Sequence, residues 1–191
     1  MSIKLSEIST RAPKEFNKEY TKQKLQGILA ELDELQNMLY AESKHAVLIL
    51  IQGMDASGKD GAVKNVFGTL NPLGVVAKSF KVPSEEEKAH DFLWRIHSHA
   101  PAKGMIQVFN RSQYEEVLIT RVHKWVDTET AHKRMKAIND FEMLLKEHNN
   151  TIILKFYLHI SKEKQAERLN ERLTEPKKHW KADPNDFKEA E

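Results

Sequence analysis

The first clear pattern along the chain is helical. Apolar residues recur at Leu25, Ile28, Leu29, Leu32, Leu35 and Leu39. Steps of three and four place these side chains on one face of a helix. The pattern predicts an amphipathic helix in an N-terminal segment, residues 1–45, that packs against a core formed by residues 46–191.

From Ala46 onward, short apolar runs alternate with helical stretches. The runs are rich in β-branched or aromatic residues and are bounded by polar, glycine or proline residues, which is typical of strands. They span 46–52, 75–80, 105–110 and 151–160. One helical stretch opens with Ser84 and Glu87 at the spacing of a capping box, ahead of Phe92. Strands that alternate with helices predict an α/β fold with a mainly parallel sheet covered on both faces.

Composition narrows the classes of function. The 191 residues carry a net charge of only +2, so a polyanion would have to bind a local patch, and no general affinity for nucleic acid or membranes is expected. The absence of cysteine excludes disulfides, thiolate metal sites and thiol nucleophiles. The longest apolar run, Ala46 to Ile51, is far shorter than the ~20 residues of a membrane span. We expect one soluble, cytoplasmic domain whose polar C-terminus, from His179, is loose or incomplete.

A phosphate-binding loop follows the first predicted strand. Gly53 to Lys59 has the sequence GMDASGK, which fits G-x-x-x-x-G-K between a strand and a helix. In that setting loop N–H groups, a helix N-terminus and the lysine ammonium hold phosphate oxygens. The alternative is a turn that binds nothing, which the preceding strand and the lysine in register disfavour. The predicted phosphate ligands are Gly53, Ala56, Ser57, Gly58, Lys59, Asp60 and Gly61.

Two carboxylates, Asp55 and Asp60, stand where the phosphate is expected. A carboxylate a few Å from a phosphate is repelled by about 1 kcal/mol in water and by more at lower dielectric constant. Mg²⁺, or Mn²⁺ in its place, would convert this repulsion into shared coordination, with Asp55 as the better placed ligand. Two alternatives stay open: Asp55 as the group that orients the attacking phosphate oxygen, and Asp60 as a first-turn acid favoured by the helix dipole.

A second motif, Asn110-Arg111-Ser112, ends the third predicted strand. Ligands of open α/β sheets bind at the carboxyl ends of strands, so this motif should face the loop. Arg111 would clamp phosphate. Glu115 would supply a second metal ligand if a helix starts at Ser112; the alternative is a capping box formed by Ser112 and Glu115.

Four ordered segments carry a resemblance to a known family. GMDASGKDG, residues 79–97, residues 109–123 and residues 167–181 together resemble the polyphosphate kinase type 2 family. The resemblance implies a thymidylate-kinase-like, three-layer α/β/α P-loop core with a helical lid at about 161–182. It also implies Mg²⁺-dependent phosphoryl transfer between inorganic polyphosphate and a nucleotide, with Asp55, Lys59 and Arg111 at the reaction centre. The motif N-R-S, with asparagine in place of the aspartate of D-R-S, resembles the branch of the family that accepts nucleoside monophosphates as well as diphosphates.

The same resemblance gives a role to basic residues elsewhere. Arg168 and Arg172 lie four residues apart on a predicted helix after Ser161, so they share a face and would neutralise phosphates from the lid. A solvated charged face is the alternative. Arg121 and Lys124 are candidates for tracking a long polyanion. Family members form dimers or tetramers, so a homo-oligomer is expected. They also continue past the end of this chain, so either the sequence is truncated or this is a shortened member with an incomplete lid and C-terminal subdomain.

Polyphosphate-dependent phosphorylation of AMP, ADP or GDP is the function that these residues favour. One alternative is an ATP-dependent nucleotide or small-molecule kinase of the same fold, since the loop would hold either phosphate chain. Another is a polyphosphate-binding protein without catalytic activity.

Overall fold

Four parallel strands form the centre of the protein. The structure, a computed structural model, describes residues 4–181, and within them the strands are β1 (Ala46–Gly53), β2 (Val75–Ser79), β3 (Ile106–Asn110) and β4 (Thr151–Leu158). Their order in the sheet is β2-β3-β1-β4, and every neighbouring pair is parallel. The four predicted strands are therefore confirmed, although the last ends two residues earlier than the sequence suggested.

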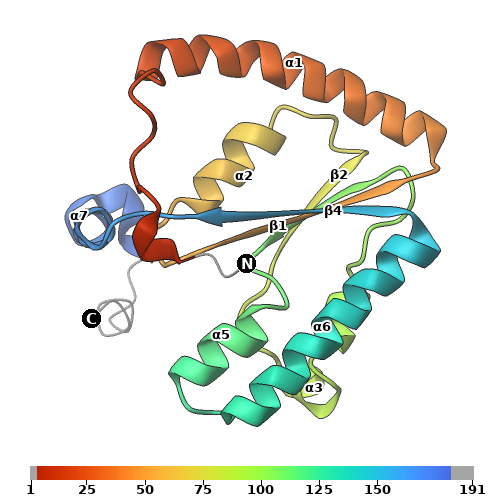
Figure 1. Ribbon diagram of the computed structural model, residues 1–191. Helices are drawn as coiled ribbons and strands as arrows, with labels where there is room; N and C mark the ends of the chain where they lie inside the picture. Colours follow the sequence, from red (N-terminus) through yellow and green to blue (C-terminus); the bar gives the residue numbers. More distant parts are fainter. Residues whose placement is uncertain (1–3, 182–191) are drawn as a thin grey trace.

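Helices cover both faces of this sheet (Figure 1). The long α1 (Lys18–Glu42) and the shorter α2 (Lys59–Phe67) lie on one face. On the other face lie α3 (Glu85–Ala89), α4 (Trp94–His97), α5 (Glu115–Val122) and α6 (Thr128–Asn149). Beyond the carboxyl end of β4 come α7 (Lys162–Thr174) and the 3-10 helix η2 (Pro176–Lys181), which we call the lid segment. A further 3-10 helix, η1 (Leu5–Glu7), precedes α1. The predicted three-layer α/β/α architecture is confirmed.

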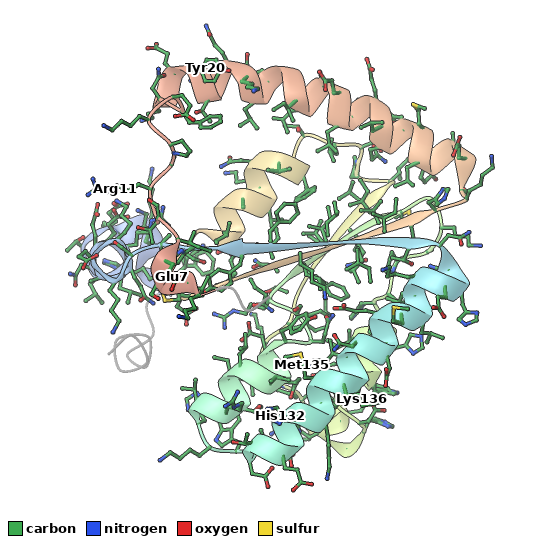
Figure 2. All side chains as sticks on the ribbon, viewed as in Figure 1. Glu7, Arg11, Tyr20, His132, Met135 and Lys136 are labelled. Carbon is green, nitrogen blue, oxygen red and sulfur yellow. The ribbon has the colours of Figure 1, made fainter. Side chains whose placement is uncertain are left out.

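Alternation along β1 builds a core on each face of the sheet. Ile49 and Ile51 pack with Val108 toward α1 and α2, whereas Leu48 and Leu50 pack with Phe109, Phe141 and Leu145 toward α6. These strand residues are almost fully buried, which is expected of a parallel sheet covered on both sides. A smaller cluster joins α5 to α6, and Met135 points into it from α6 (Figure 2).

The N-terminal helix only partly follows its predicted pattern. Leu32 and Leu39 pack on the sheet, and Gln36 is buried at a position between them in the sequence. Ile28 and Leu35, in contrast, are exposed. The apolar stripe is therefore wider than the face that α1 buries among the residues described here.

The helical stretch after β2 is divided in two. Ser84 and Glu87 form the predicted capping box, with Oγ of Ser84 accepting from the Glu87 N–H at 3.2 Å. The helix ends at Ala89, and the carboxylate of Asp91 accepts from the Leu93 N–H at 2.9 Å, which starts a separate turn. The C-terminus was predicted to be loose from His179, but residues 179–181 belong to η2, and the part beyond Lys181 lies outside the described residues. No helix within residues 4–181 is long and apolar enough to cross a membrane.

Candidate active site

The loop between β1 and α2 has the backbone shape of a phosphate cradle. Gly53 and Gly58 have φ of 155° and 103°, and Ala56 also lies in the left-handed region, at 58°. A side chain at Gly53 would place a Cβ atom 2.8 Å from the carbonyl oxygen of Leu158, so only glycine fits there. The loop ends where α2 begins at Lys59, and the helix N-terminus is aimed at the space that the loop encloses.

A pocket of about 300 Å³ opens at the carboxyl ends of the strands. Its walls come from the loop, from the ends of β2 and β3, and from the lid segment. The pocket is lined by Asp55, Ala56, Ser57, Gly58, Lys59, Asp60, Gly61, Ser79, Asn110, Arg111, Arg168, Glu171, Arg172, Lys178 and Lys181. Most of the predicted site residues are thus brought together in one place.

Lys59 is held against the loop backbone. Its Nζ donates hydrogen bonds to the carbonyl oxygens of Gly53 at 2.7 Å and Met54 at 2.9 Å. Burial lowers the pKa of Lys59 below its usual range, and the nearby charge of Arg111 adds to this effect. Gly53 therefore contributes a carbonyl that positions the lysine, although it does not itself line the pocket.

Cations of the protein itself neutralise both loop carboxylates. Asp55 pairs with the guanidinium of Arg111, which follows β3. Asp60 pairs with Lys181 of the lid segment and also accepts from the Asn110 side-chain amide at 2.8 Å. The hydrogen bond from Lys181 is the main reason that the pKa of Asp60 lies below its usual range. These ion pairs offset the charge of both carboxylates while no phosphate is bound.

Glu115 reaches the site from the opposite side of Arg111. Its Oε2 lies 3.9 Å from Nη1 of Arg111, and burial raises the pKa of its carboxyl group above the usual range. The helix α5 begins at Glu115 itself, and the side chain of its N-cap residue, Tyr114, makes no capping hydrogen bond. Ser112 accepts instead from the Tyr114 N–H at 3.3 Å. The predicted capping box of Ser112 and Glu115, and a helix start at Ser112, are both wrong, because a turn separates β3 from α5.

The lid segment is tied to the backbone of the loop. Nη1 of Arg168 donates to the carbonyl oxygens of Ala56 at 3.0 Å and Ser57 at 2.8 Å. One turn earlier on α7, the amide of Gln165 donates to the carbonyl oxygen of Asp55 at 3.2 Å. Arg168 thus shapes the loop as well as lining the pocket, and Gln165 was not foreseen because an isolated glutamine carries no motif.

Some candidates lie elsewhere, and some pocket residues were not foreseen. Arg121 and Lys124 are exposed near the C-terminal end of α5 and do not line the pocket. Ser79 and Glu171 do line it. Ser79 is the last residue of β2, so the rule that ligands bind at strand ends could have found it. Glu171 lies among lid cations, and its carboxylate pairs with Lys178 at 2.7 Å, so the lysine-rich lid is partly neutralised from within.

The carboxylates suit a cation that is shared with phosphate. Among residues 4–181 there is no group of three or more histidine, aspartate or glutamate side chains that could hold a metal alone. Asp55 and Glu115 both flank Arg111, and so they offer two carboxylates beside the loop. Mg²⁺ is commonly held by one or two carboxylates together with water and substrate phosphates, so this donor set fits it.

Sequence comparison decides the family. The family model of polyphosphate kinase 2 matches residues 15–191, nearly the whole chain. The chain belongs to the polyphosphate kinase 2 family. Within this family, an AMP/ADP-polyphosphate phosphotransferase of Meiothermus ruber is 51% identical over 78% of the chain, and an ADP-polyphosphate phosphotransferase of Rhodopseudomonas palustris is 43% identical over 92%.

A solved structure of the polyphosphate kinase 2 family has the same fold. The crystal structure of polyphosphate kinase 2 from Arthrobacter aurescens superimposes with a TM-score of 0.93 over 98% of this chain, at 44% identity. The present chain spans 68% of that protein, and 56% and 64% of the Meiothermus and Rhodopseudomonas relatives. Parts of these relatives therefore have no counterpart in the chain described here.

Proposed function

We propose that this chain transfers a phosphoryl group between inorganic polyphosphate and a nucleoside mono- or diphosphate such as AMP, ADP or GDP. The observation that carries the proposal is the charge of the pocket. Among the described residues that line it, six are cationic and three anionic, namely Lys59, Arg111, Arg168, Arg172, Lys178 and Lys181 against Asp55, Asp60 and Glu171. This local excess of positive charge surrounds a loop shaped for phosphate and suits a substrate with several adjacent phosphates.

The residues of the site would act by position and charge. Phosphoryl transfer involves little covalent chemistry by the protein, so catalysis depends on alignment of the reacting oxygens and on stabilisation of the developing negative charge. Loop N–H groups and Lys59 would hold one phosphate chain, and Arg111 would bridge to the transferred group. Arg172, Lys178 and Lys181 of the lid segment would neutralise charge from the opposite wall.

A divalent cation, which we propose to be Mg²⁺ with Mn²⁺ as a substitute, would be held by Asp55 and Glu115. Bound there, it would offset the negative charge of the phosphates. Arg111 now lies between these carboxylates, so it would have to exchange a carboxylate partner for a phosphate oxygen. We also propose a homo-oligomer, a dimer or tetramer, which light scattering of the purified chain would measure.

The test is product formation from polyphosphate in the absence of ATP. The purified chain is incubated with AMP or ADP, polyphosphate and Mg²⁺, and nucleotides are separated by chromatography. We expect ADP or ATP to form, and we expect Asp55→Asn to abolish turnover while polyphosphate is still retained. Product that forms only when ATP is the donor would establish an ATP-dependent kinase. Retention of polyphosphate with no product from either donor would establish a binding protein.

A further inference from the structure

A buried cluster of charged side chains connects the segment after β2 with the first turn of α5. Its centre is Arg95 of α4, whose side chain is only 8% exposed. Nη2 of Arg95 donates to Oε1 of Glu116 at 2.9 Å, and Nη1 donates to the carbonyl oxygen of Lys81 at 2.8 Å. The guanidinium also lies 5.5 Å from the centre of the Phe80 ring. Arg95 therefore joins two segments that are far apart in the sequence.

One of these segments follows a residue that lines the pocket, and the other carries a glutamate that contacts Arg111, itself a lining residue. Lys81 and Phe80 directly follow Ser79, which lines the pocket at the end of β2. Glu116 directly follows Glu115 in the first turn of α5, and Glu115 faces Arg111. The two consecutive glutamates thus point to different partners, one toward the phosphate site and one toward Arg95. A shift of α5 that lengthened the Arg95 contact would move Glu115 by a similar amount.

The first turn of α5 lacks the usual means of fixing a helix start. No side chain caps it, and Arg111, four residues before Glu115, has a left-handed backbone with φ of 66°. A second cation, Arg134 of α6, donates to the carbonyl oxygen of Glu116 at 2.8 Å and lies 3.3 Å from its Oε2. Arg134 holds Glu116 from the side of α6 but makes no hydrogen bond to the segment after β2.

We propose that Arg95 is a positioning residue for phosphoryl transfer, because it fixes the end of β2 and the first turn of α5 at the separation that the reacting phosphates require. Stability alone does not explain such a residue well, since a buried ion pair can often be replaced by apolar side chains without loss of stability. The planar guanidinium of arginine donates to both Glu116 and the Lys81 carbonyl oxygen from separate nitrogen atoms. Lysine has a single ammonium group, so it does not reproduce this geometry.

The inference rests on the proposed transfer reaction, and its test compares Arg95 with Arg134. In Arg95→Met we expect kcat to fall by about 10–100-fold while KM for ADP and polyphosphate changes little, since a misplacement of about 1 Å can cost that much in rate. In Arg95→Lys, which keeps the charge, kcat should fall by about 3–10-fold. The matched control Arg134→Met removes a cation that contacts the same glutamate, and its kcat should fall by less than about threefold.

Thermal unfolding of each variant separates position from stability. Turnover is measured at least 15 °C below the unfolding midpoint of each variant, and ethylguanidinium is added to Arg95→Ala, where we expect it to restore part of kcat. If Arg95→Met and Arg134→Met lose equal activity, or if kcat per folded molecule stays at the wild-type value while only the midpoint falls, the proposal is overturned.

Binding of tripolyphosphate with Mg²⁺, measured by calorimetry, distinguishes failure of this inference from failure of the proposed function. A wild-type chain that binds tripolyphosphate without forming product refutes the transfer reaction. A wild-type chain that forms product, together with an Arg95→Met variant that keeps the wild-type kcat, refutes only the positioning role. Affinity for tripolyphosphate should change little in Arg95→Met, in line with its little-changed KM. A wild-type chain that neither binds nor reacts refutes both.

Discussion

Arg111 combines an unfavourable backbone with two carboxylate neighbours. Its φ of 66° lies in a region that costs a residue other than glycine about 1 kcal/mol or more, and its guanidinium lies between Asp55 and Glu115. Such a conformation persists where surrounding contacts hold it, and here the Arg111 N–H donates to the carbonyl oxygen of Ile51 at 3.2 Å while the guanidinium pairs with Asp55. The residue therefore serves to orient a planar fork of donors, and positive charge alone would not replace it.

We predict that Arg111→Lys lowers kcat with polyphosphate by about 10–100-fold, the equivalent of one charge-assisted hydrogen bond lost in the transition state. The unfolding midpoint should change little, because the charge beside Asp55 is retained. Steady-state kinetics and calorimetry measure the two effects. An activity within twofold of wild type would show that Arg111 acts only as a point charge.

Lys124 provides a matched control at the same scale. It too has a positive φ, of 56°, but it is exposed and does not line the pocket. Lys124→Gly relieves the backbone and should leave kcat with tripolyphosphate within about twofold of wild type and the midpoint unchanged or slightly higher. A selective loss of affinity for long chains would instead support the predicted role of Lys124 in tracking a polyanion.

The Asp60–Lys181 pair predicts a dependence of stability on pH. The pKa of Asp60 is lowered from its ordinary 3.8, mainly by the hydrogen bond from Lys181. A carboxyl group with a lowered pKa stabilises the fold fully above its ordinary value, and this contribution is lost as the pH falls through the lowered value. The carboxylate is largely exposed, so the effect should be small and reduced by salt.

Asp60→Asn is therefore expected to lower the unfolding midpoint slightly at pH 7. The difference from wild type should disappear at a pH well below 3.8. Calorimetry at pH 7, 5 and 3 measures it, with low salt throughout. A difference that is constant across this range would mean that Lys181 does not hold Asp60 in solution.

Among the elements, α7 has the closest connection to the loop. Through Arg168 and Gln165 it donates three hydrogen bonds to the carbonyl oxygens of Asp55, Ala56 and Ser57. These carbonyls have no place in a regular helix or strand, and satisfying them fixes the loop in the shape that turns its N–H groups inward. The helix α7 thus supports the shape of the loop in addition to lining the pocket.

Arg168→Ala should cost about 1–2 kcal/mol, a fall of about 2–8 °C in midpoint for a chain of this length, because two loop carbonyls lose a charged donor. We also expect weaker binding of tripolyphosphate. Calorimetry measures both quantities. Glu167→Ala is the control, since this neighbour on α7 is exposed and pairs with Lys164 on the same helix. Equal losses of stability and of tripolyphosphate binding in the two variants would indicate that the bonds from Arg168 to the loop have no special role.

What the sequence could predict at this scale follows from local chemistry. Three features depend only on neighbouring residues in the chain: the strand β1, the G-x-x-x-x-G-K loop and the capping box at Ser84. The structure contains all three. Asp60 bonds to Lys181, which lies 121 positions away in the sequence, and Arg168 bonds to Ser57, which lies 111 positions away. No local pattern encodes such distant partners. The break between α3 and α4 was missed because a single aspartate, Asp91, outweighs the apolar spacing around it.

At the scale of the whole molecule, charge is concentrated rather than abundant. The chain carries a net +2, whereas the described side chains that line the pocket carry an excess of three positive charges. A polyanion is thus attracted by one concave region, while the remaining surface is close to neutral. Binding at such a region depends on ionic strength according to the number of phosphates neutralised there, irrespective of the overall charge.

We predict that the affinity for long-chain polyphosphate falls steeply between 50 and 300 mM KCl, by analogy with single-stranded nucleic acids, which lose about 0.7 log units of affinity per neutralised phosphate for each log unit of salt. Lys181→Gln removes one pocket cation and should reduce this slope by about 0.7, the contribution of one neutralised phosphate. Lys133→Gln on α6, an exposed residue paired with Glu129, should leave the slope unchanged. Fluorescence titration with labelled polyphosphate measures the slope for each protein. Equal slopes for the two variants would mean that polyphosphate spreads over the surface, which the concentration of positive charge in one pocket argues against.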